Sequence, residues 1–175
     1  MQRYQLEHAL RAASEITGEK EFIIVGSSAL LGQIPEPPAE LTQSLEVDLY
    51  PRHNPGAAEK LNAIGELSLF HTTHGFWLDP VGPKTATLPQ GWEDRLVRVS
   101  NEHTKQAVGW CLELHDLAAS KLFAGREKDL EFVRAMLRHK YLNKDLLRQR
   151  TESVATDGSK KVLALNRLKN LRNTK

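Results

Sequence analysis

Residues 22–51 read FIIVGSSALLGQIPEPPAELTQSLEVDLYP, in which two apolar runs are separated by a glycine-serine turn and a proline-rich segment. Residues 22–25 are apolar and rich in β-branched side chains, which predicts a strand buried on both faces. Gly26, Ser27 and Ser28 interrupt this run, and the apolar residues after them predict the first turn of a helix. Because glycine permits close approach of the backbone and the free amides of a helix start bind anions, this turn suits a phosphate.

The second apolar run, residues 45–50, carries two carboxylates, Glu46 and Asp48. Side chains alternate along a strand, so both carboxylates leave on one face while the apolar residues leave on the other. Adjacent carboxylates repel each other, and a divalent cation between them relieves the repulsion. The run therefore predicts a metal-binding strand, and a solvated strand face beside an ordinary turn is the alternative.

A glycine-serine turn followed by paired acids resembles the first signature of the nucleotidyltransferase superfamily. The two parts are VGS at residues 25–27 and EVD at residues 46–48. The spacer is longer than in the family pattern, and the first acid is Glu where Asp is commoner. The resemblance implies a small mixed sheet flanked by helices, Mg²⁺ or Mn²⁺ as cofactor, and a nucleoside triphosphate as substrate.

A later segment offers a third carboxylate. Residues 67–70 and 75–78 predict one or two strands, and Asp79 follows directly. The resemblance implies a third acid on a later strand, and Asp79 is the best-placed residue for it; an acid that begins a tight turn is the alternative. His71 and His74 have no third ligand at a suitable spacing, so neither is assigned to a metal.

Residues 112–134 read LELHDLAASKLFAGREKDLEFVR. Asp116 predicts an N-cap and Gly125 a helix end, after which a second helix begins at Lys128. An αα-hairpin with exposed charges is one interpretation of this pattern. A solvated position for Lys121 belongs to that interpretation.

The same residues resemble the later motifs of the AbiEii-type toxin and abortive-infection nucleotidyltransferases and of an uncharacterised small nucleotidyltransferase-like family (DUF6036-like). The matching elements are Asp-Leu-Ala-x-x-Lys-Leu, Ala-Gly-Arg and Lys-Asp. By that resemblance Lys121 contacts the nucleotide phosphates, Asp129 is the motif's acid, and Arg126 or Lys128 assists.

The composition, with 40% hydrophobic and 26% charged residues in 175, predicts one globular core. A single cysteine, Cys111, excludes an internal disulfide and suits a reducing compartment. The first residues contain no long apolar stretch, and no segment approaches the length of a membrane span. We therefore expect a cytoplasmic protein without a membrane partner.

Charge is distributed unevenly along the chain. Residues 138–175 hold eleven Lys or Arg against three acids, whereas residues 1–137 hold thirteen against nineteen. Such asymmetry is typical of a protein with a polyanionic partner, and a solvated helical tail is the alternative. The last helix is expected to pack through one apolar stripe: Val162, Leu165, Leu168 and Leu171.

The sequence thus predicts an α/β protein with a nucleotidyltransferase-like core, residues 1–137, and a basic helical extension, residues 138–175. The expected activity is metal-dependent transfer of a nucleotide to a hydroxyl, on tRNA or another RNA, by a toxin with a cognate antitoxin protein. The alternative is a catalytically weak scaffold that binds protein or RNA as an antitoxin or regulator. The expected catalytic residues are Glu46, Asp48, Lys121 and Asp129. The expected nucleotide-binding residues are Gly26, Ser27, Ser28, Lys121 and Arg126, and the expected metal ligands are Glu46, Asp48 and Asp79.

Overall fold

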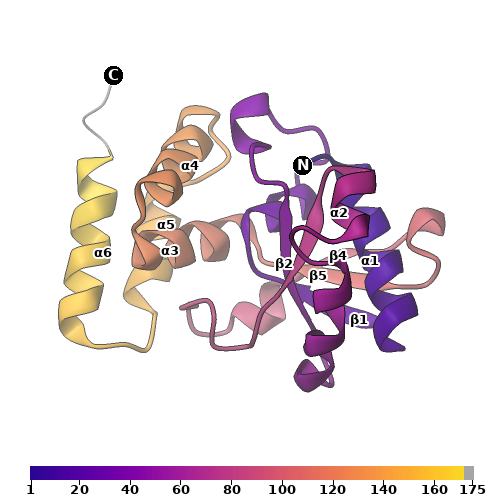
Figure 1. The fold of residues 1–175 in the computed structure, drawn as a ribbon. Helices are drawn as coiled ribbons and strands as arrows, with labels where there is room; N and C mark the ends of the chain where they lie inside the picture. The colour runs from indigo at the N-terminus through magenta and orange to yellow at the C-terminus, as the bar shows by residue number, and fades with distance from the viewer. Residues whose placement is uncertain (172–175) are drawn as a thin grey trace. The chain divides into compact units, whose positions relative to one another are not determined.

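The computed structural model describes residues 1–171 and shows an α/β fold (Figure 1). Its helices and strands are α1 (Arg3–Thr17), β1 (Glu21–Ile24), β2 (Glu46–Pro51), α2 (Leu69–His74), β3 (Trp77–Pro80), β4 (Val97–Val99), β5 (Val108–Cys111), α3 (Leu114–Ala124), α4 (Glu127–Arg138), α5 (Lys144–Glu152) and α6 (Gly158–Asn170). Short 3₁₀ helices lie between them: η1 (Ser27–Gly32), η2 (Ala39–Leu41), η3 (Pro55–Ile64), η4 (Trp92–Arg95) and η5 (Glu102–Thr104).

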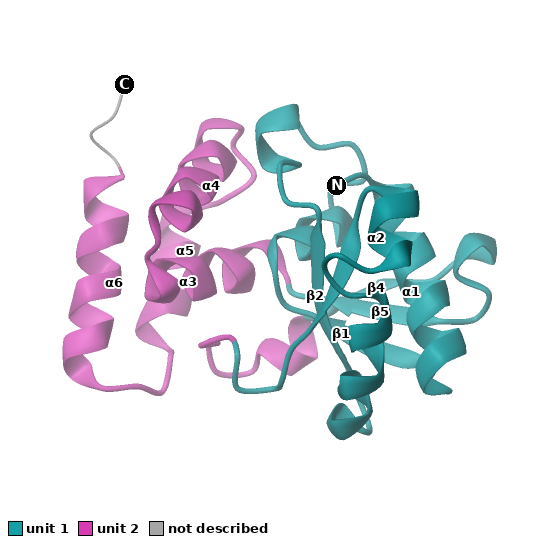
Figure 2. Ribbon diagram, in the orientation of Figure 1, with its two compact units in different colours: residues 1–85, 96–112 teal, residues 86–95, 113–175 magenta. Residues whose placement is uncertain are grey.

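The chain divides into two compact units, which Figure 2 colours separately. Unit 1 comprises Met1–Thr85 and Leu96–Leu112 and contains the whole sheet, whereas unit 2 comprises Ala86–Arg95 and the chain from Glu113 onward. The helices α3 and α4 therefore belong to the same compact unit as α5 and α6.

Unit 1 is built on one mixed five-stranded sheet in the order β3-β2-β1-β5-β4. The central strand β1 is antiparallel to β2 and parallel to β5, and the outer pairs are β2 parallel to β3 and β4 antiparallel to β5. The combination of parallel and antiparallel pairs confirms the mixed sheet that the resemblance implied.

Helix α1 covers one face of this sheet. Four of its apolar residues recur at helical spacing and are fully buried: Leu6, Ala9, Leu10 and Ala13. The helix ends at Gly18, which adopts the left-handed conformation that glycine favours. A Cβ at Gly109 of β5 would lie only 2.8 Å from Leu10 Cδ1 and 3.0 Å from Ile24 Cδ1. The absence of a side chain at Gly109 therefore allows α1 to approach the face of the sheet that carries Ile24.

Of the one or two strands predicted at residues 67–70 and 75–78, only β3 forms. Residues 67–70 instead lead into α2, where the N-cap Ser68 accepts a hydrogen bond from the His71 N–H at 3.1 Å. The predicted N-cap of the next α-helix was wrong. Helix α3 begins at Leu114, and its N-cap is Glu113 rather than Asp116. The Glu113 carboxylate accepts the N–H groups of His115 and Asp116, so a residue three positions earlier took the capping role.

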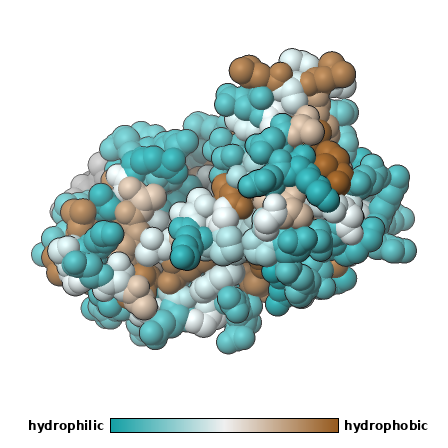
Figure 3. All heavy atoms as spheres, turned by 60° about the horizontal axis from the view of Figure 1, so that its bottom comes forward, coloured by the Kyte–Doolittle hydropathy of each residue, from teal (hydrophilic) through white to brown (hydrophobic). Residues whose placement is uncertain are grey.

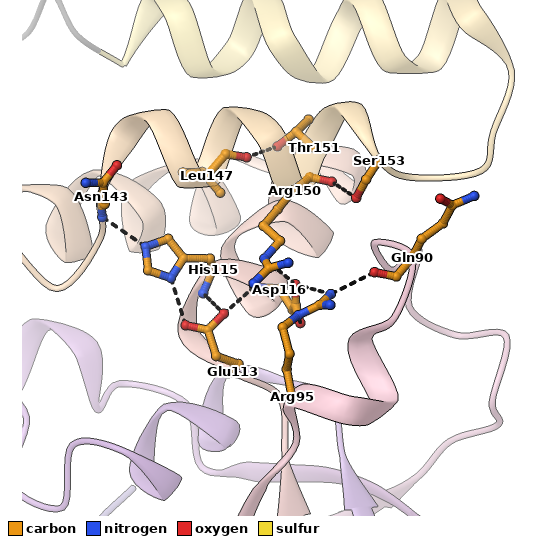
Figure 4. A network of polar contacts seen from close by, with 10 residues as sticks. All are labelled: Gln90, Arg95, Glu113, His115, Asp116, Asn143, Leu147, Arg150, Thr151 and Ser153. Carbon is orange, nitrogen blue, oxygen red and sulfur yellow. Dashed lines mark hydrogen bonds and ion pairs between the residues drawn. The ribbon is translucent and has the colours of Figure 1, made fainter.

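In unit 2, helix α3 contacts α4, α5 and α6. Asp116 of α3 is completely buried and receives two hydrogen bonds from the Arg95 guanidinium, at 2.8 and 3.0 Å (Figure 4). Arg150 of α5 lies 3.5 Å from the same carboxylate. Because a buried carboxylate without partners is costly, this pairing ties the segment Ala86–Arg95 and helix α5 to α3.

His115 extends the polar network of Figure 4. Its Nδ1 lies 2.7 Å from a Glu113 carboxylate oxygen, and its Nε2 accepts the Asn143 N–H at 2.9 Å. Because the Nε2 of this imidazole accepts a hydrogen bond, Nδ1 is the nitrogen that donates to Glu113. The loop before α5 is thereby held to the start of α3.

Some large hydrophobic side chains remain exposed. Figure 3 shows that hydrophobic residues on the face it draws gather in small groups among hydrophilic ones. Leu67 and Leu69 are 85% and 83% exposed at the start of α2. On α6, Val162 is 58% exposed and does not belong to the buried stripe, which instead contains Ala164, Leu168 and Leu171. The predicted stripe was therefore wrong at Val162.

Candidate functional site

The pairing of β2 with β3 places the three predicted metal ligands together on one face of the sheet. Glu46 pairs with Trp77 and Asp48 pairs with Asp79 in a parallel register. Paired residues project to the same side, and so do residues two apart on one strand. Glu46, Asp48 and Asp79 therefore share one face of two adjacent strands.

This carboxylate face is opposite to the face that α1 covers. The Ile24 side chain lies on the side of the sheet that α1 covers, as does that of its pairing partner Leu49. Because side chains alternate along a strand, Asp48 projects to the opposite side. The burial agrees, because Val47 and Leu49 are fully buried while Glu46 and Asp48 are partly exposed. The sequence prediction that the two acids leave on one face and the apolar residues on the other is confirmed.

Gly26 lies directly against the Asp48 carboxylate. A Cβ at Gly26 would fall 1.6 Å from Asp48 Oδ2 and 2.4 Å from its Cγ, which no real side chain permits. The Val25 N–H donates to the Asp48 carbonyl at 3.1 Å. The hydrogen bonds between the chain of β1 and strand β2 therefore continue to Val25, and the turn begins at Gly26. The structure therefore places the glycine of the turn in contact with the second acid of β2.

Replacing Gly26 by alanine is expected to displace the Asp48 carboxylate and to lower the free energy of unfolding by about 1–3 kcal/mol, the usual cost of overpacking. Gly26 has φ −86°, so an alanine meets no backbone strain and the effect is purely steric. Denaturant unfolding measures it. Gly82→Ala is the matched control, because nothing lies within 4 Å of a Cβ there. Equal stability of Gly26→Ala and Gly82→Ala would contradict the close approach of Gly26 to Asp48.

The electrostatics of this face disfavour three negative charges. Burial raises the pKa of Asp79 above its ordinary value, and the negative charges of Glu46 and Glu66 raise it further. Within residues 1–171, no three His, Cys, Asp or Glu side chains form a group that could hold a metal ion by themselves. Proteins usually hold Mg²⁺ through one or two carboxylates together with substrate phosphates, and this donor set fits that type of site.

The serines of the turn begin η1. Ser28 is buried, and its hydroxyl has no hydrogen-bond partner among the described residues, whereas Ser27 is half-buried. A buried hydroxyl without a partner is uncommon in folded proteins and marks a place where an acceptor or donor is missing. Ser27 and Ser28 stay candidates for binding the nucleotide.

In unit 2, Lys121, Arg126 and Asp129 form one ion cluster. Lys121 Nζ donates to Asp129 Oδ1 at 3.1 Å, and Arg126 donates to both carboxylate oxygens at 2.6 and 3.2 Å. Burial acts to raise the pKa of Asp129, but the Arg126 hydrogen bond and the Lys121 charge outweigh it and hold this pKa below its usual value.

Lys121 is buried, and its ammonium lies 4.6 Å from the centroid of the Phe132 ring. The interpretation of Lys121 as a solvated residue of an αα-hairpin was therefore wrong. From the sequence, different roles were predicted for Lys121, Arg126 and Asp129 of the second motif, but in the structure both basic side chains donate hydrogen bonds to Asp129. Their assignment to nucleotide binding and catalysis stays a prediction.

Two residues near the carboxylates were missed from the sequence. Glu66 affects the pKa of Asp79, although it precedes that residue by thirteen positions and lies outside every strand. Trp77 pairs with Glu46 and lies two residues before Asp79, so its ring is on the carboxylate face. The alternation of a strand that ends at Asp79 could have placed Trp77 there.

The basic C-terminal segment is only partly available to a partner. Arg167 donates to the carbonyls of Leu122 and Phe123 at 2.8 and 3.1 Å and caps the end of α3. A Cβ at Gly125 would lie 2.0 Å from Arg167 Cζ, so the guanidinium is packed against that glycine. Lys160 and Lys169 are exposed on α6, while Arg172 and Lys175 lie outside the described residues.

Comparison with known proteins identified one family. The model of a family described as "Nucleotidyltransferase of unknown function (DUF6036)" matches residues 4–173. Neither the curated proteins nor the solved structures contain a match. The resemblance to AbiEii-type toxins stays a prediction. No helix within residues 1–171 combines the length and the apolar character that crossing a membrane requires.

Proposed function

Because the chain belongs to the DUF6036 family of nucleotidyltransferases of unknown function, we propose that it transfers a nucleotide from a nucleoside triphosphate to a hydroxyl acceptor. The observation that supports this best is the register of β2 and β3, which brings Glu46, Asp48 and Asp79 to one face, with Gly26 against Asp48. Paired carboxylates beside a glycine turn are suited to a divalent cation and a phosphate chain.

The carboxylates of this face and the glycine-serine turn each have a defined role in the proposed reaction. Glu46 and Asp48 would hold Mg²⁺ or Mn²⁺ together with the substrate phosphates, while Asp79 lies on the same face beside them; the cation, when bound, would neutralise the triphosphate and align the attacking oxygen. The backbone at Gly26 admits the phosphates closely, and Ser27 and Ser28 offer hydroxyl groups to them. The protein thereby contributes positioning and charge rather than covalent chemistry.

For Lys121 we propose a part in binding the nucleotide phosphates, and Arg126 would assist. The support is their place in the second motif and their positive charges, which converge on Asp129. In this proposal Asp129 positions the Lys121 ammonium, so that its charge is directed before the nucleotide arrives.

Nucleotide binding and transfer test the proposal directly. A nucleoside triphosphate with Mg²⁺ at about 100 times its dissociation constant should raise the free energy of unfolding by about 2.7 kcal/mol. Mass spectrometry of protein and RNA after incubation with each labelled triphosphate then identifies the product. No thermal stabilisation by any of the four common triphosphates with Mg²⁺ or Mn²⁺ would contradict the proposed activity.

A binding role without catalysis is the second candidate. Glu46 stands where the family pattern has Asp more often, and Lys121 is already paired with Asp129. Both features fit a nucleotidyltransferase-like scaffold that binds a protein or an RNA, as an antitoxin or regulator would. Stabilisation by RNA or a protein partner, with none by a triphosphate, would favour this role.

We further propose that the acceptor is an RNA, tRNA in particular, held by the basic segment of residues 138–175. Because carboxylates repel phosphate, an RNA acceptor needs positive charge at another place on the protein. Exposed lysines on α6 supply such charge. A toxin with a cognate antitoxin protein is the biological setting that this acceptor fits.

Reversing two exposed charges on α6 tests the RNA proposal. Lys160→Glu with Lys169→Glu is expected to lower tRNA affinity and to flatten its salt dependence by about 0.7–0.9 in logarithmic slope for each phosphate that is no longer neutralised. Lys60→Glu with Lys105→Glu reverses two exposed lysines of unit 1 and is the matched control. Titrations of labelled tRNA at several salt concentrations measure the slope. Identical slopes for the two variants would argue for a protein or small-molecule acceptor.

A further inference from the structure

Trp77 places an aromatic ring beside the carboxylates. It pairs with Glu46 across the parallel β2–β3 ladder and precedes Asp79 by two residues, so its side chain projects to the carboxylate face. The residue between them, Leu78, is fully buried on the other side of the sheet. Trp77 itself is only partly buried, although it is one of the largest apolar side chains of unit 1.

The Trp77 ring is held in place from α2. The imidazole of His71 lies 4.5 Å from the Trp77 ring, between centroids, at an interplanar angle of 46°. His71 Nδ1 accepts the Leu67 N–H at 3.1 Å, which fixes the imidazole in turn. Since β3 is an edge strand, Trp77 has a neighbouring strand on one side only. The ring is thus supported by a neighbour while part of its surface is left to solvent.

We propose that Trp77 stacks on the nucleobase of the nucleotide that binds at the carboxylates. The turn at Gly26 and strand β3 lie on opposite sides of β2, two strand spacings or about 10 Å apart. Phosphates at the turn, a cation at β2 and a base at β3 therefore follow the order of groups along a nucleotide. This inference rests on the proposed function and adds to it the residue that binds the base.

Stacking also predicts how selective the site is. Every nucleobase offers a π-face, so an aromatic platform binds bases with little discrimination. The neighbours of Trp77 on the sheet, Glu46 and Asp79, face the metal site in the proposal, and His71 of α2 supports the ring. We therefore expect Trp77 to contribute to the binding of all four common nucleoside triphosphates.

Trp110 is a natural control on the same face of the sheet. It pairs with Ile23 of β1, which pairs with Tyr50 of β2, two residues beyond Asp48. The Trp110 indole N–H donates to Glu21 at 2.7 Å, and the Arg52 guanidinium lies 4.7 Å from its ring centroid. Trp110 lies on β5, which is separated from β2 by β1, whereas Trp77 pairs directly with Glu46 of β2. Both the indole N–H and the ring of Trp110 also have partners in the protein, so the structure assigns no base to it.

The test compares Trp77→Leu with Trp110→Leu, using ATP and inorganic tripolyphosphate, each with Mg²⁺, as probes in calorimetry. ATP affinity is expected to fall about 5- to 150-fold in Trp77→Leu, the range for loss of one stacked base, and to stay unchanged in Trp110→Leu. Tripolyphosphate carries no base, so its affinity should be the same in wild type and both variants. Trp77→Phe keeps a flat ring and should recover most of the ATP affinity.

A second measurement uses the native Trp77. In a Trp92→Phe, Trp110→Phe variant, Trp77 is the sole indole, and ATP but not tripolyphosphate should quench its fluorescence. Equal ATP affinity in wild type and Trp77→Leu, or absence of quenching while ATP binds, would overturn the assignment and leave the proposed function standing. If wild type binds neither probe, the proposed function itself fails and this inference fails with it.

Discussion

Asp48→Asn is expected to lower nucleotidyl transfer at least about 100-fold, the usual loss when one group that stabilises transition-state charge is removed. Asp48 is central to the carboxylate face, since it adjoins Glu46 along β2, Asp79 across the ladder and Gly26 at the turn. The amide keeps the shape of the carboxylate but cannot balance the charge of a divalent cation. Transfer of labelled nucleotide, measured at saturating Mg²⁺, gives the size of the loss.

The same variant should be as stable as wild type, or more stable, when no metal is present. Burial raises the pKa of Asp79, and the negative charges of Glu46 and Glu66 raise it further. Asp48 lies beside Glu46 along β2 and opposite Asp79 across the ladder, so the substitution removes a negative charge next to two other carboxylates. Glu59→Gln alters an exposed carboxylate of η3 and serves as the control. Transfer activity of Asp48→Asn within a few-fold of wild type would exclude Asp48 from the site.

Asp129→Ala is expected to destabilise the protein by about 3 kcal/mol, because it leaves the Lys121 ammonium buried without its carboxylate. Arg126 is largely exposed and can be hydrated, so the cost arises mainly at Lys121. The pKa of Asp129 is lower than its unfolded value of 3.8. Its contribution is therefore present above pH 3.8 and is lost as the pH falls through the lowered pKa.

A double-mutant cycle separates the structural role of this cluster from its role in binding. Lys121→Met keeps an unbranched chain near Phe132 and removes the charge, so adding it to Asp129→Ala should recover part of the lost stability. If Lys121 also binds phosphate, Lys121→Met should weaken triphosphate binding by about 1.5–3 kcal/mol. Full stability recovery with unchanged triphosphate affinity would identify Lys121 as a purely structural residue.

Much of the carboxylate face follows from local sequence rules. Alternation alone put Glu46 and Asp48 on one face and the apolar residues of β2 on the other. Gly125 ended its helix where expected, because it adopts the left-handed backbone angles that favour glycine. The α/β class and the family could be predicted from the sequence because strand alternation, turns and motif spacing are properties of short segments.

Other features depend on interactions between distant segments. Asp79 pairs with Asp48 only because β3 joins β2 in a parallel register, and a shift by one residue would turn Asp79 to the other face. Asp116 was predicted as the N-cap of α3, but Glu113 caps this helix. Asp116 is buried instead, because Arg95 and Arg150 compensate its negative charge.

The sequence by itself determined the fold class, the alternation of β2, the glycine turn and the two family motifs. Only the tertiary structure decided that Asp79 faces Asp48, that Trp77 lies beside Glu46, that Lys121 is buried on Asp129, and that Arg167 caps α3. The reason is physical: backbone preference and side-chain alternation act within a few residues. Strand register and the partners of buried charges depend instead on hydrogen bonds and desolvation between segments that are far apart in the chain.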